Sequence, residues 1–371
     1  MRIVILTNDF PPNGRGGAGI IAQQQEKALI ARGHDVTVLY EPPVFVRHGA
    51  IRRLFGHLHD LGARNSLVQQ ALDVRPEALI THSLTGCGFG TAKEIRSHGV
   101  RWIHVLHDVQ LFEPSGQIIH GESFPFLRHL WRRMWSRVRR RVFGTPDLVL
   151  SPSKWLIGIH ARYGFFIHAD CRVLPNPIPV FENQELAEHV QDMSDDILFV
   201  GRLDSDKGVS ILLEAWRELG EDRPTVHLVG SGTMKESIEQ QNDPKIVLHG
   251  TLPHERIFHL YSGKPTVVIP SLVFENQPTV ILEALSLGCR VIASRVGGIP
   301  ELLEGGDGIL VPPGDVEALK DAILQCHSER SRGIPLKRDP SASVGMTKTI
   351  LSRHAPESVF DQLESFLKSN L

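Results

Sequence analysis

The chain has 371 residues, of which 41% are hydrophobic and 22% are charged, and its formal net charge is −2. This length fits two domains of roughly 150 to 200 residues better than a single core. No apolar run approaches the roughly 20 residues that cross a bilayer, and the start of the chain lacks the pattern of a signal peptide. We therefore expect a globular cytoplasmic protein, with the inner face of the plasma membrane as one place for peripheral attachment.

The charge is divided unevenly along the chain. Residues 1–180 hold 22 Lys and Arg against 13 Asp and Glu, whereas residues 181–371 hold 18 against 29, so the two halves carry +9 and −11. This difference favours an anionic partner for the first half, such as a lipid surface or a charged acceptor. No motif indicates nucleic acid, and we expect none as a partner.

Short apolar runs alternate with helical patterns through the first half, which is typical of a doubly wound α/β domain. The run at 3–6 predicts a strand, which is followed by a helix near 20–32 and a strand at 35–40. Three further runs are short enough for buried strands of a parallel sheet, namely 78–81, 102–106 and 148–150.

A Pro-rich passage at 174–179 and a polar stretch up to residue 196 predict a linker, after which the same rhythm restarts. Further strands are expected at 197–200, 226–229, 246–248, 266–270, 290–293 and 308–311. Residues 328–348, rich in Ser, Arg, Lys and Pro, predict an exposed insertion, and 357–367 has the apolar spacing of a packing helix. The pattern therefore divides the chain into a Rossmann-like domain at 1–180, a second at 181–350, and a packing helix within 351–371.

A glycine-rich loop at 14–19 precedes the first helix, where missing side chains let backbone amides approach a phosphate. Gly14, Gly16 and Gly19 satisfy the dinucleotide pattern, with Glu41 at the end of the second strand as its ribose ligand. Residues 9–13 separate the strand from the first glycine, however, which gives a longer loop than a dinucleotide fold has. A flexible turn without a ligand stays the alternative.

A second motif, at 201–208, lies between a predicted strand and a predicted helix at 209–217. Arg202 and Lys207 would lie at the carboxyl end of that strand, where open α/β sheets bind ligands, and together they can hold the two phosphates of a diphosphate. The alternatives are an ordinary charged turn and a divalent metal held by Asp204 and Asp206, which the flanking cations disfavour.

A third motif, at 270–285, runs from a strand through a loop into a helix. Pro278 suits the first helical turn and Gly288 the carboxyl end, so Glu275 lies in the loop and Glu283 on the helix. Carboxylates bind sugar hydroxyls well because each accepts several hydrogen bonds, and the amides at the helix start suit a phosphate.

With these motifs the chain resembles family 4 of the retaining glycosyltransferases, which have the GT-B fold of two Rossmann-like domains. The matching stretches are 14–19, His107-Asp108, 150–153, 174–176, 201–208, 229–232, 275–283 and 296–301. The resemblance implies that the parallel sheets of the two domains face each other across a cleft. It also implies that the first domain is the acceptor side and that the second binds a nucleotide-sugar.

The resemblance also implies residue roles. Arg202 and Lys207 would hold the diphosphate, Glu283 the ribose and Glu275 the donor sugar near its reacting carbon, with His107 across the cleft near the sugar and the acceptor. The implied catalytic set is Glu275, His107, Arg202 and Lys207. The implied donor-binding set is Gly16, Gly17, Arg202, Lys207, Glu275, Asn276, Thr279 and Glu283.

The implied reaction moves a sugar from a nucleoside-diphosphate sugar to a hydroxyl acceptor, with a lipid-linked acceptor as one candidate, in polysaccharide, lipopolysaccharide or glycolipid synthesis. Double displacement would need a second carboxylate about 5 Å from the first, and the motifs assign none. We expect same-face attack without metal or cofactor. The run Asn276-Gln277-Pro278 departs from the stretch that many family members have, which leaves the donor sugar open.

A basic amphipathic segment precedes residue 145. Its apolar stripe comprises Leu127, Leu130, Trp131, Met134, Trp135 and Val138, and its arginines are Arg128, Arg132, Arg133, Arg137, Arg139, Arg140 and Arg141. One interpretation is attachment to an anionic membrane surface or a lipid-linked acceptor through 128–141. The other is a helix whose stripe faces the core and whose arginines face solvent.

Three other functions stay open. A nucleotide-sugar epimerase has the same two-domain fold, although Arg202, Lys207, Glu275 and Glu283 argue against it. A nicotinamide-dependent oxidoreductase would use Gly14, Gly16, Gly19 and Glu41. A regulatory protein that binds the donor without turnover is the third.

Overall fold

The computed structural model describes residues 1–11, 17–41, 58, 60–61, 67–123, 125–178, 192–303, 308–331 and 350–369. The chain divides into two compact units. Unit 1 comprises Met1–Ile118, Glu122–Pro177 and Glu357–Leu371, and unit 2 comprises Ile119–Gly121 and Ile178–Pro356. Each unit is an α/β body built on one parallel sheet, which confirms the expected pair of Rossmann-like sheets.

The sheet of unit 1 has six parallel strands in the order β2-β1-β3-β4-β5-β6. Its strands are β1 (Arg2–Thr7), β2 (Asp35–Tyr40), β3 (Ala78–Thr81), β4 (Arg101–Val105), β5 (Leu148–Ser151) and β6 (Asp170–Val173). Its helices are α1 (Gly17–Ala31), α3 (Leu67–Asp73), α4 (Thr91–Ser97), α5 (Pro125–Phe143), α6 (Lys154–Arg162) and α14 (Pro356–Lys368). The first five strands confirm the predicted ones to within a residue at each end. The edge strand β6 was not expected, because its sequence Asp-Cys-Arg-Val has no apolar run.

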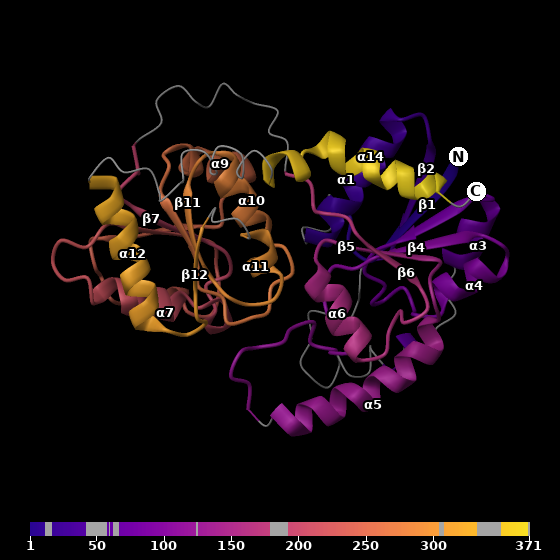
Figure 1. Cartoon of the computed structure of the whole chain (residues 1–371), viewed down its shortest axis with the longest axis horizontal. Coiled ribbons are helices and arrows are strands. Elements are labelled where there is room, and N and C mark those ends of the chain that lie inside the picture. The colour runs from indigo at the N-terminus through magenta and orange to yellow at the C-terminus, as the bar shows by residue number, and fades with distance from the viewer. Residues whose placement is uncertain are drawn as a thin grey trace. The chain divides into compact units, whose positions relative to one another are not determined.

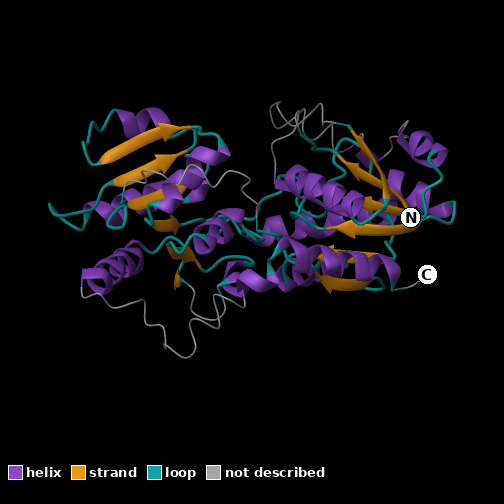
Figure 2. Cartoon of the chain, turned by 90° about the horizontal axis from the view of Figure 1, so that it is seen from above, coloured by secondary structure: helices purple, strands orange, loops and turns teal. Residues whose placement is uncertain are grey.

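Both faces of this sheet are buried, as Figure 2 shows from the helices on either side of the strands. Ile3 and Ile5 pack with α1 and α14, whereas Val4 and Leu6 pack with α3, α4 and α6 on the opposite face. Successive side chains of a strand point to opposite faces, so a continuous apolar run is what a doubly covered strand requires. The sheet is therefore a rigid platform for the loops at its carboxyl edge.

The C-terminal helix α14 returns to unit 1 and lies beside α1, yellow against indigo in Figure 1. Arg32, just after α1, forms a 2.6 Å ion pair with Asp361 and lies over the ring of Phe360 at 5.9 Å. Leu363 is fully buried in the same cluster. The sequence predicted a packing helix at this position, and the structure shows that the helix packs on unit 1.

Helix α5 corrects one sequence expectation. Its apolar stripe is exposed, whereas Arg132 and Arg139 are buried, so the interpretation in which the stripe faces the core is wrong. Arg132 tolerates burial because Glu113 and Glu122 accept its hydrogen bonds at 2.6 to 2.7 Å. Trp135, predicted within the stripe, is buried instead. The side of α5 that packs against unit 1 therefore carries two buried arginines, and Arg132 is ion-paired there with Glu113 and Glu122.

The sheet of unit 2 also has six parallel strands, in the order β12-β11-β10-β7-β8-β9. They are β7 (Ile197–Val200), β8 (Val226–Val229), β9 (Ile246–Gly250), β10 (Thr266–Ile269), β11 (Arg290–Ser294) and β12 (Ile309–Val311), which confirm the six predicted strands. The helices are α7 (Val209–Arg217), α8 (Lys235–Glu239), α9 (His254–Ser262), α10 (Thr279–Ser286), α11 (Ile299–Leu302) and α12 (Val316–Ser331), with a 3₁₀ turn η2 (Ser205–Lys207). The sequence predicted an exposed insertion at 328–348. This prediction is wrong for residues 328–331, which form the end of α12. Residues 332–349 lie outside the described part.

Each sheet contains a topological switch point, where two neighbouring strands send the chain in opposite directions. In unit 2 these strands are β7 and β10, and in unit 1 they are β1 and β3. Open α/β sheets bind ligands outside the carboxyl ends of such a strand pair, because the loops diverge there and leave a crevice. The switch points are therefore where a functional site is expected in each unit.

Candidate functional site

Two loops meet at the switch point of unit 2, one after β7 and the other after β10. The amides of Leu272 and Val273 donate to the carbonyl oxygen of Asp206 at 3.0 and 3.2 Å. Gly208, in the left-handed region at φ 74°, lies so close that a Cβ there would be 1.9 Å from the carbonyl oxygen of Pro270. Only glycine fits this contact. The backbone itself therefore fixes the two loops against each other.

These loops bring Lys207 and Glu275 into direct contact. The Lys207 Nζ atom lies 2.5 Å from Glu275 Oε1, and the Ser271 hydroxyl donates to the same oxygen at 3.1 Å. Both charged side chains are about four-fifths buried, so the pair is better shielded from solvent than a surface ion pair. Two residues that are 68 positions apart, and that the motifs assigned separately to a diphosphate and a sugar, thus lie in one place.

Arg202 lies in the same loop after β7 and is half exposed. Its two terminal nitrogens contact Asp204 at 2.5 Å and Asp206 at 2.8 Å. Asp204 also accepts hydrogen bonds from the amide and hydroxyl of Thr233, and the amide bond is the main reason that the pKa of Asp204 is lowered. The two aspartates therefore bind the terminal nitrogens of the guanidinium, which has five N–H donors in all. Both aspartates of the alternative metal motif are engaged with this arginine.

A third loop, between β11 and α11, supports Glu275 from its backbone. Gly297 has φ 60°, and a Cβ there would be 1.9 Å from the carbonyl oxygen of Glu275. The amide of Gly298 donates to that oxygen at 2.8 Å. A glycine is therefore needed at position 297, where the loop that carries Glu275 is closest to its neighbour.

Glu283 is buried on α10, with 4% of its surface exposed. The Nε2 atom of His254, at the start of α9, lies 3.2 Å from Glu283 Oε1, and this hydrogen bond raises the pKa of His254. Burial and the nearby Glu283 carboxylate raise the pKa of Tyr261 well above its usual range. Sequence reasoning found Glu283 but missed His254, which no spacing in the sequence connects to it.

The start of α10 completes the site of unit 2. Pro278 is the capping residue, Thr279 is the first helical residue, and Asn276 lies half-buried in the loop between Glu275 and the helix. Gly288 follows the end of the helix with φ 75°, as the sequence predicted. The amides of the first helical turn thus begin at Thr279, four residues after Glu275, and such amides favour an anion.

In unit 1 the loops after β3 and β4 bring two histidines together. The Nδ1 atom of His82 lies 2.7 Å from the Nε2 atom of His107, and the rings stack with centroids 5.0 Å apart. Burial lowers the pKa of His107 to about 4 and that of His82 well below its usual range. Both rings are therefore neutral near pH 7, and one donates its proton to the other. His82 was not expected from the sequence.

The segment after His107 is held by a buried arginine of α5. Burial raises the pKa of Asp108 to about 6, and the amide of Gln110 donates to its carboxylate at 2.8 Å. Arg139 donates to the carbonyl oxygen of Gln110, and burial lowers the pKa of Arg139 to about 9. Its guanidinium lies over the ring of Phe89 at 4.8 Å. The loop that carries His107 is therefore fixed by α5.

The glycine loop is described only in its second half. Helix α1 begins at Gly17, and a Cβ at Gly19 would lie 2.7 Å from the carbonyl oxygen of Asp9, so a glycine is needed where the helix meets the loop after β1. Gly14 and Gly16 lie outside the described residues. Glu41 follows β2 directly, with its amide 3.3 Å from the carbonyl oxygen of Thr7.

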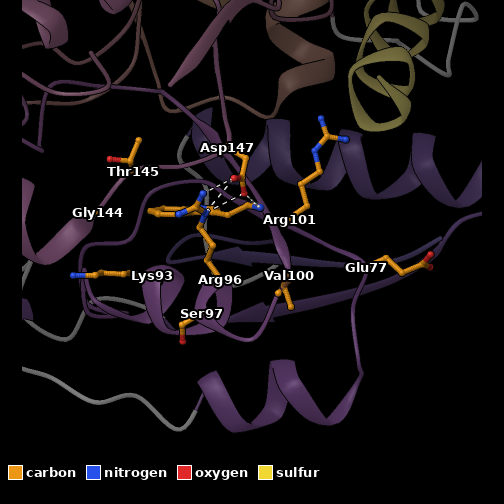
Figure 3. Close-up of a pocket in the computed structure, with 11 residues that line it drawn as sticks. Glu77, Lys93, Arg96, Ser97, Val100, Arg101, Gly144, Thr145 and Asp147 are labelled. Atoms are coloured by element: carbon orange, nitrogen blue, oxygen red, sulfur yellow. Dashed lines mark hydrogen bonds and ion pairs between the residues drawn. The ribbon is translucent and has the colours of Figure 1, made fainter. Parts of the chain in front are cut away.

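A separate hollow of about 910 Å³ lies at the amino ends of β3, β4 and β5 in unit 1 (Figure 3). Its cations have structural partners: Arg96 pairs with Asp147 at 2.6 Å, and Arg101 donates to two carbonyl oxygens of α14. Lys93 donates to the carbonyl oxygen of Arg141 at 3.4 Å. The hollow lies at the edge of the sheet opposite the switch point, and its charges fasten helices to strands.

Two family models match the chain. Residues 15–180 match the model described as Glycosyltransferase Family 4, and residues 194–329 match the model described as Glycosyl transferases group 1. The first match covers most of unit 1 and the second covers most of unit 2. The second match contains Arg202, Lys207, Glu275 and Glu283, and the first contains His107.

Relatives are similar over nearly the whole chain. TuaC of Bacillus subtilis, assigned as a teichuronic acid biosynthesis glycosyltransferase, is 25% identical over 89% of this chain and 90% of its own. Sucrose-phosphate synthase of Thermosynechococcus elongatus superposes with a TM-score of 0.71 at 20% identity, covering 100% of this chain and 99% of that one. HepE of Anabaena in complex with UDP-glucose superposes with a TM-score of 0.68 at 18% identity, covering 100% of both chains. The likeness to the two solved structures shows a shared fold.

Proposed function

The chain belongs to the family 4 glycosyltransferases, and we propose that it moves a sugar from a nucleoside-diphosphate sugar to a hydroxyl acceptor with retention of configuration. The observation that carries the proposal is the meeting of Arg202, Lys207 and Glu275 at the switch point of unit 2. This is where α/β sheets bind nucleotides, and the residues are two cations and a carboxylate, which suit a diphosphate and a sugar respectively.

The diphosphate of the donor is bound by Arg202 and Lys207. Each cation is held from one side by carboxylates and has further N–H donors for phosphate oxygens. The carboxylates fix the cations before the donor arrives, so little side-chain freedom is lost when it binds. As the bond from the sugar carbon to the diphosphate breaks, these donors and the first amides of α10 stabilise the charge on the leaving oxygen.

Same-face attack explains retention better than a covalent sugar–enzyme intermediate. Glu275 is ion-paired with Lys207 and hydrogen-bonded by Ser271, which suits a group that positions the sugar rather than a nucleophile. In the proposed step the acceptor oxygen bonds to the sugar carbon as the diphosphate leaves, and the acceptor proton passes to the leaving diphosphate oxygen. Arg202 and Lys207 supply the positive charge that a divalent metal would otherwise provide, so we propose that the reaction needs no metal and no cofactor.

Glu283 binds the ribose of the donor. Its carboxylate is buried and anchored by His254 through one oxygen, which fixes its position for hydroxyl groups that need an acceptor. Asn276 and Thr279, on the same loop and at the start of α10, contribute polar contacts to the donor.

Unit 1 carries the acceptor side in this proposal. His107 is neutral, so it exchanges hydrogen bonds with a hydroxyl group without presenting a charge, and its hydrogen bond with His82 holds the ring in place. The similarity to TuaC, assigned to teichuronic acid biosynthesis, and to HepE in complex with UDP-glucose supports a nucleotide-linked donor and a role in cell-envelope polysaccharide synthesis, with a lipid-linked hydroxyl as a candidate acceptor.

The test is to incubate the protein with UDP-, GDP- and ADP-sugars in EDTA and to follow nucleoside diphosphate release and the released or transferred sugar by NMR. The proposal predicts release with one donor class, a first-formed sugar with the anomeric configuration of the donor, and no loss in EDTA. Inverted product would contradict retention, and loss in EDTA would contradict metal independence. A sugar epimer without transfer would indicate an epimerase, and turnover only with NAD(H) would indicate an oxidoreductase.

A further inference from the structure

Helix α5 presents an apolar face to solvent. Of the thirteen large apolar side chains recorded as exposed in the described residues, six lie on this helix and are between 40% and 76% exposed: Phe126, Leu127, Leu130, Trp131, Met134 and Val138. From Leu127 onward they follow at spacings of one, three or four residues, which places them along one side of an α-helix. Scattered exposed apolar residues are ordinary, but a concentration on one face marks an interaction surface.

A row of arginines borders this face. Arg133, Arg137 and Arg141 are exposed and follow one another every four residues, so they form a parallel stripe next to the apolar side chains. The sequence of α5 contains no acidic residue. The outward side of the helix therefore combines an apolar face with a row of positive charges.

The inward side of α5 fastens the helix to unit 1. Arg132 is held by Glu113 and Glu122, and Arg139 lies between the rings of Phe89 and Trp135 at 4.8 and 4.6 Å. Arg132 through its ion pairs, and Arg139 through one hydrogen bond and two ring contacts, thus anchor the helix, and the exposed apolar side chains lie outside these contacts. Figure 1 shows α5 along the outside of unit 1, away from the sheet of that unit.

We propose that α5 binds the surface of an anionic lipid bilayer, with the apolar face among the acyl chains and the arginine row against phosphate headgroups. Both features match the chemistry of that surface, which offers apolar depth and negative charge together. A second copy of the chain fits less well, because two α5 faces in contact would bring arginine rows together without acidic residues between them. Within the described residues no helix is long and apolar enough to span a bilayer.

This inference goes beyond the proposed transfer reaction and stands independently of it. The same helix holds the segment after His107 through Arg139 and Gln110, so a bilayer-bound α5 would keep that segment close to the lipid surface. An acceptor that carries a lipid would then reach unit 1 without leaving its membrane.

The experiment is sedimentation of the full chain with vesicles of phosphatidylcholine, with and without phosphatidylglycerol. We expect binding only with phosphatidylglycerol, and weaker binding as salt rises. A basic residue near an anionic surface contributes about fivefold, so the triple variant Arg133→Gln, Arg137→Gln, Arg141→Gln should bind about 100-fold more weakly. The double variant Leu130→Gln, Met134→Gln should lose at least about tenfold, because it removes the apolar contact.

The matched control is Arg162→Gln with Ile167→Gln, an exposed arginine and an exposed apolar residue of unit 1 outside α5. It should bind like the parent chain. All these side chains are exposed, so unchanged thermal unfolding is expected for every variant and confirms that each is folded. Emission of Trp131, measured as the difference from Trp131→Phe, should shift to the blue with anionic vesicles, which adsorption without insertion would not cause.

Four outcomes would overturn the proposal: no binding to phosphatidylglycerol vesicles at low salt, equal binding to neutral vesicles, equal loss in the control, or a dimer that the α5 variants dissociate while vesicles are ignored. Vesicle binding by Arg202→Ala should match the parent chain. A protein that binds vesicles but transfers no sugar would therefore refute the proposed function and leave the role of α5 in place.

Discussion

The two units have the same sheet architecture and place their candidate residues at the same edge, yet the chemistry of the two sites is opposite. In unit 2 the loops carry ion pairs, Lys207 with Glu275 and Arg202 with two aspartates, in partly exposed positions. In unit 1 the loops after β3 and β4 carry His82 and His107, whose pKa values are lowered by burial so that both rings are neutral.

The difference agrees with the ligands that the proposed function assigns to each unit. A charged diphosphate needs cations that are fixed in advance, and a carboxylate partner on one side of each cation provides this without filling all of its donors. A neutral hydroxyl acceptor needs hydrogen-bonding groups without charge, which a buried imidazole provides. Under the proposed function, one fold would support a donor side in unit 2 and an acceptor side in unit 1 through different residues at the carboxyl edges of the two sheets.

The largest effect is expected from Lys207→Ala. It removes a cation from the diphosphate site and leaves Glu275 without its ion pair, so the transfer rate should fall about 100-fold or more. Steady-state kinetics of nucleoside diphosphate release measure this loss. Lys235→Ala, in the exposed pair with Glu239 on α8, is the control and should retain full activity. Parental kinetics in Lys207→Ala would contradict the proposal that this charged site binds the donor.

Gly208→Ala tests whether the two loops of unit 2 must touch. A methyl group there would meet the carbonyl oxygen of Pro270 at 1.9 Å, whereas at Gly220, which also has positive φ, it would meet nothing within 4 Å. Gly220→Ala should cost only the left-handed strain of about 1 to 2 kcal/mol. Gly208→Ala should cost clearly more and should also weaken donor binding. Equal costs in denaturant unfolding would show that the contact is not required.

The pH dependence of stability tests the neutral histidines of unit 1. Burial lowers the pKa of His104 to about 3 and that of His107 and His160 to about 4, so the unfolded chain takes up protons that the folded chain does not. The free energy of unfolding should be highest above pH 6.5 and fall towards pH 4, by at most about 1.4 kcal/mol per pH unit for each histidine. Asp108, whose pKa is raised to about 6, opposes this trend by one proton between pH 6 and 4.

Thermal unfolding of the parent chain and of His104→Phe across this range measures the effect. The variant should show a smaller loss on acidification, because one buried imidazole has been removed. His98→Gln, at the exposed end of α4, is the control and should follow the parent curve. A His104 variant with the parental slope would show that buried histidines do not cause the acid sensitivity.

The smallest effect is expected from His254→Gln. Glutamine can still donate a hydrogen bond to Glu283, so donor affinity should fall only a few fold. His254 has a raised pKa, so its contribution to stability is present below pH 6.5 and is lost as the pH rises through the value in the folded chain. Calorimetric titration with the nucleoside diphosphate measures the affinity. A loss as large as that of Lys207→Ala would make His254 a direct donor contact.

How much the sequence predicts depends on whether a feature is local. Arg202, Lys207, Glu275 and Glu283 were found because each lies in a strand–loop–helix segment whose positions can be read from one stretch of chain. His82 and His254 were missed, because their contacts with His107 and Glu283 depend on strand order and helix packing. The roles of these four motif residues stay predictions, since the geometry shows where they lie and not what they bind.

Helix α5 is a second feature that the sequence alone predicts only in part. Its period predicts two faces, but a helical pattern alone does not say which face packs inward. The usual assumption that the apolar face is buried fails here, because Glu113 and Glu122 lie where they neutralise Arg132. Acidic partners 10 and 19 residues away decide the orientation, and only the tertiary structure brings them there.

We expect unit 2 to bind a nucleoside diphosphate through Arg202 and Glu283. The most direct test is the thermal stability of the parent chain, Arg202→Ala, Glu283→Gln and the control Arg217→Ala with UDP, GDP, ADP and NAD(H). At about 100 times its dissociation constant a ligand adds about 2.7 kcal/mol to the free energy of unfolding. We predict stabilisation by one nucleoside diphosphate that is lost in the first two variants and kept in Arg217→Ala. Stabilisation by NAD(H) alone that survives both substitutions would contradict the account.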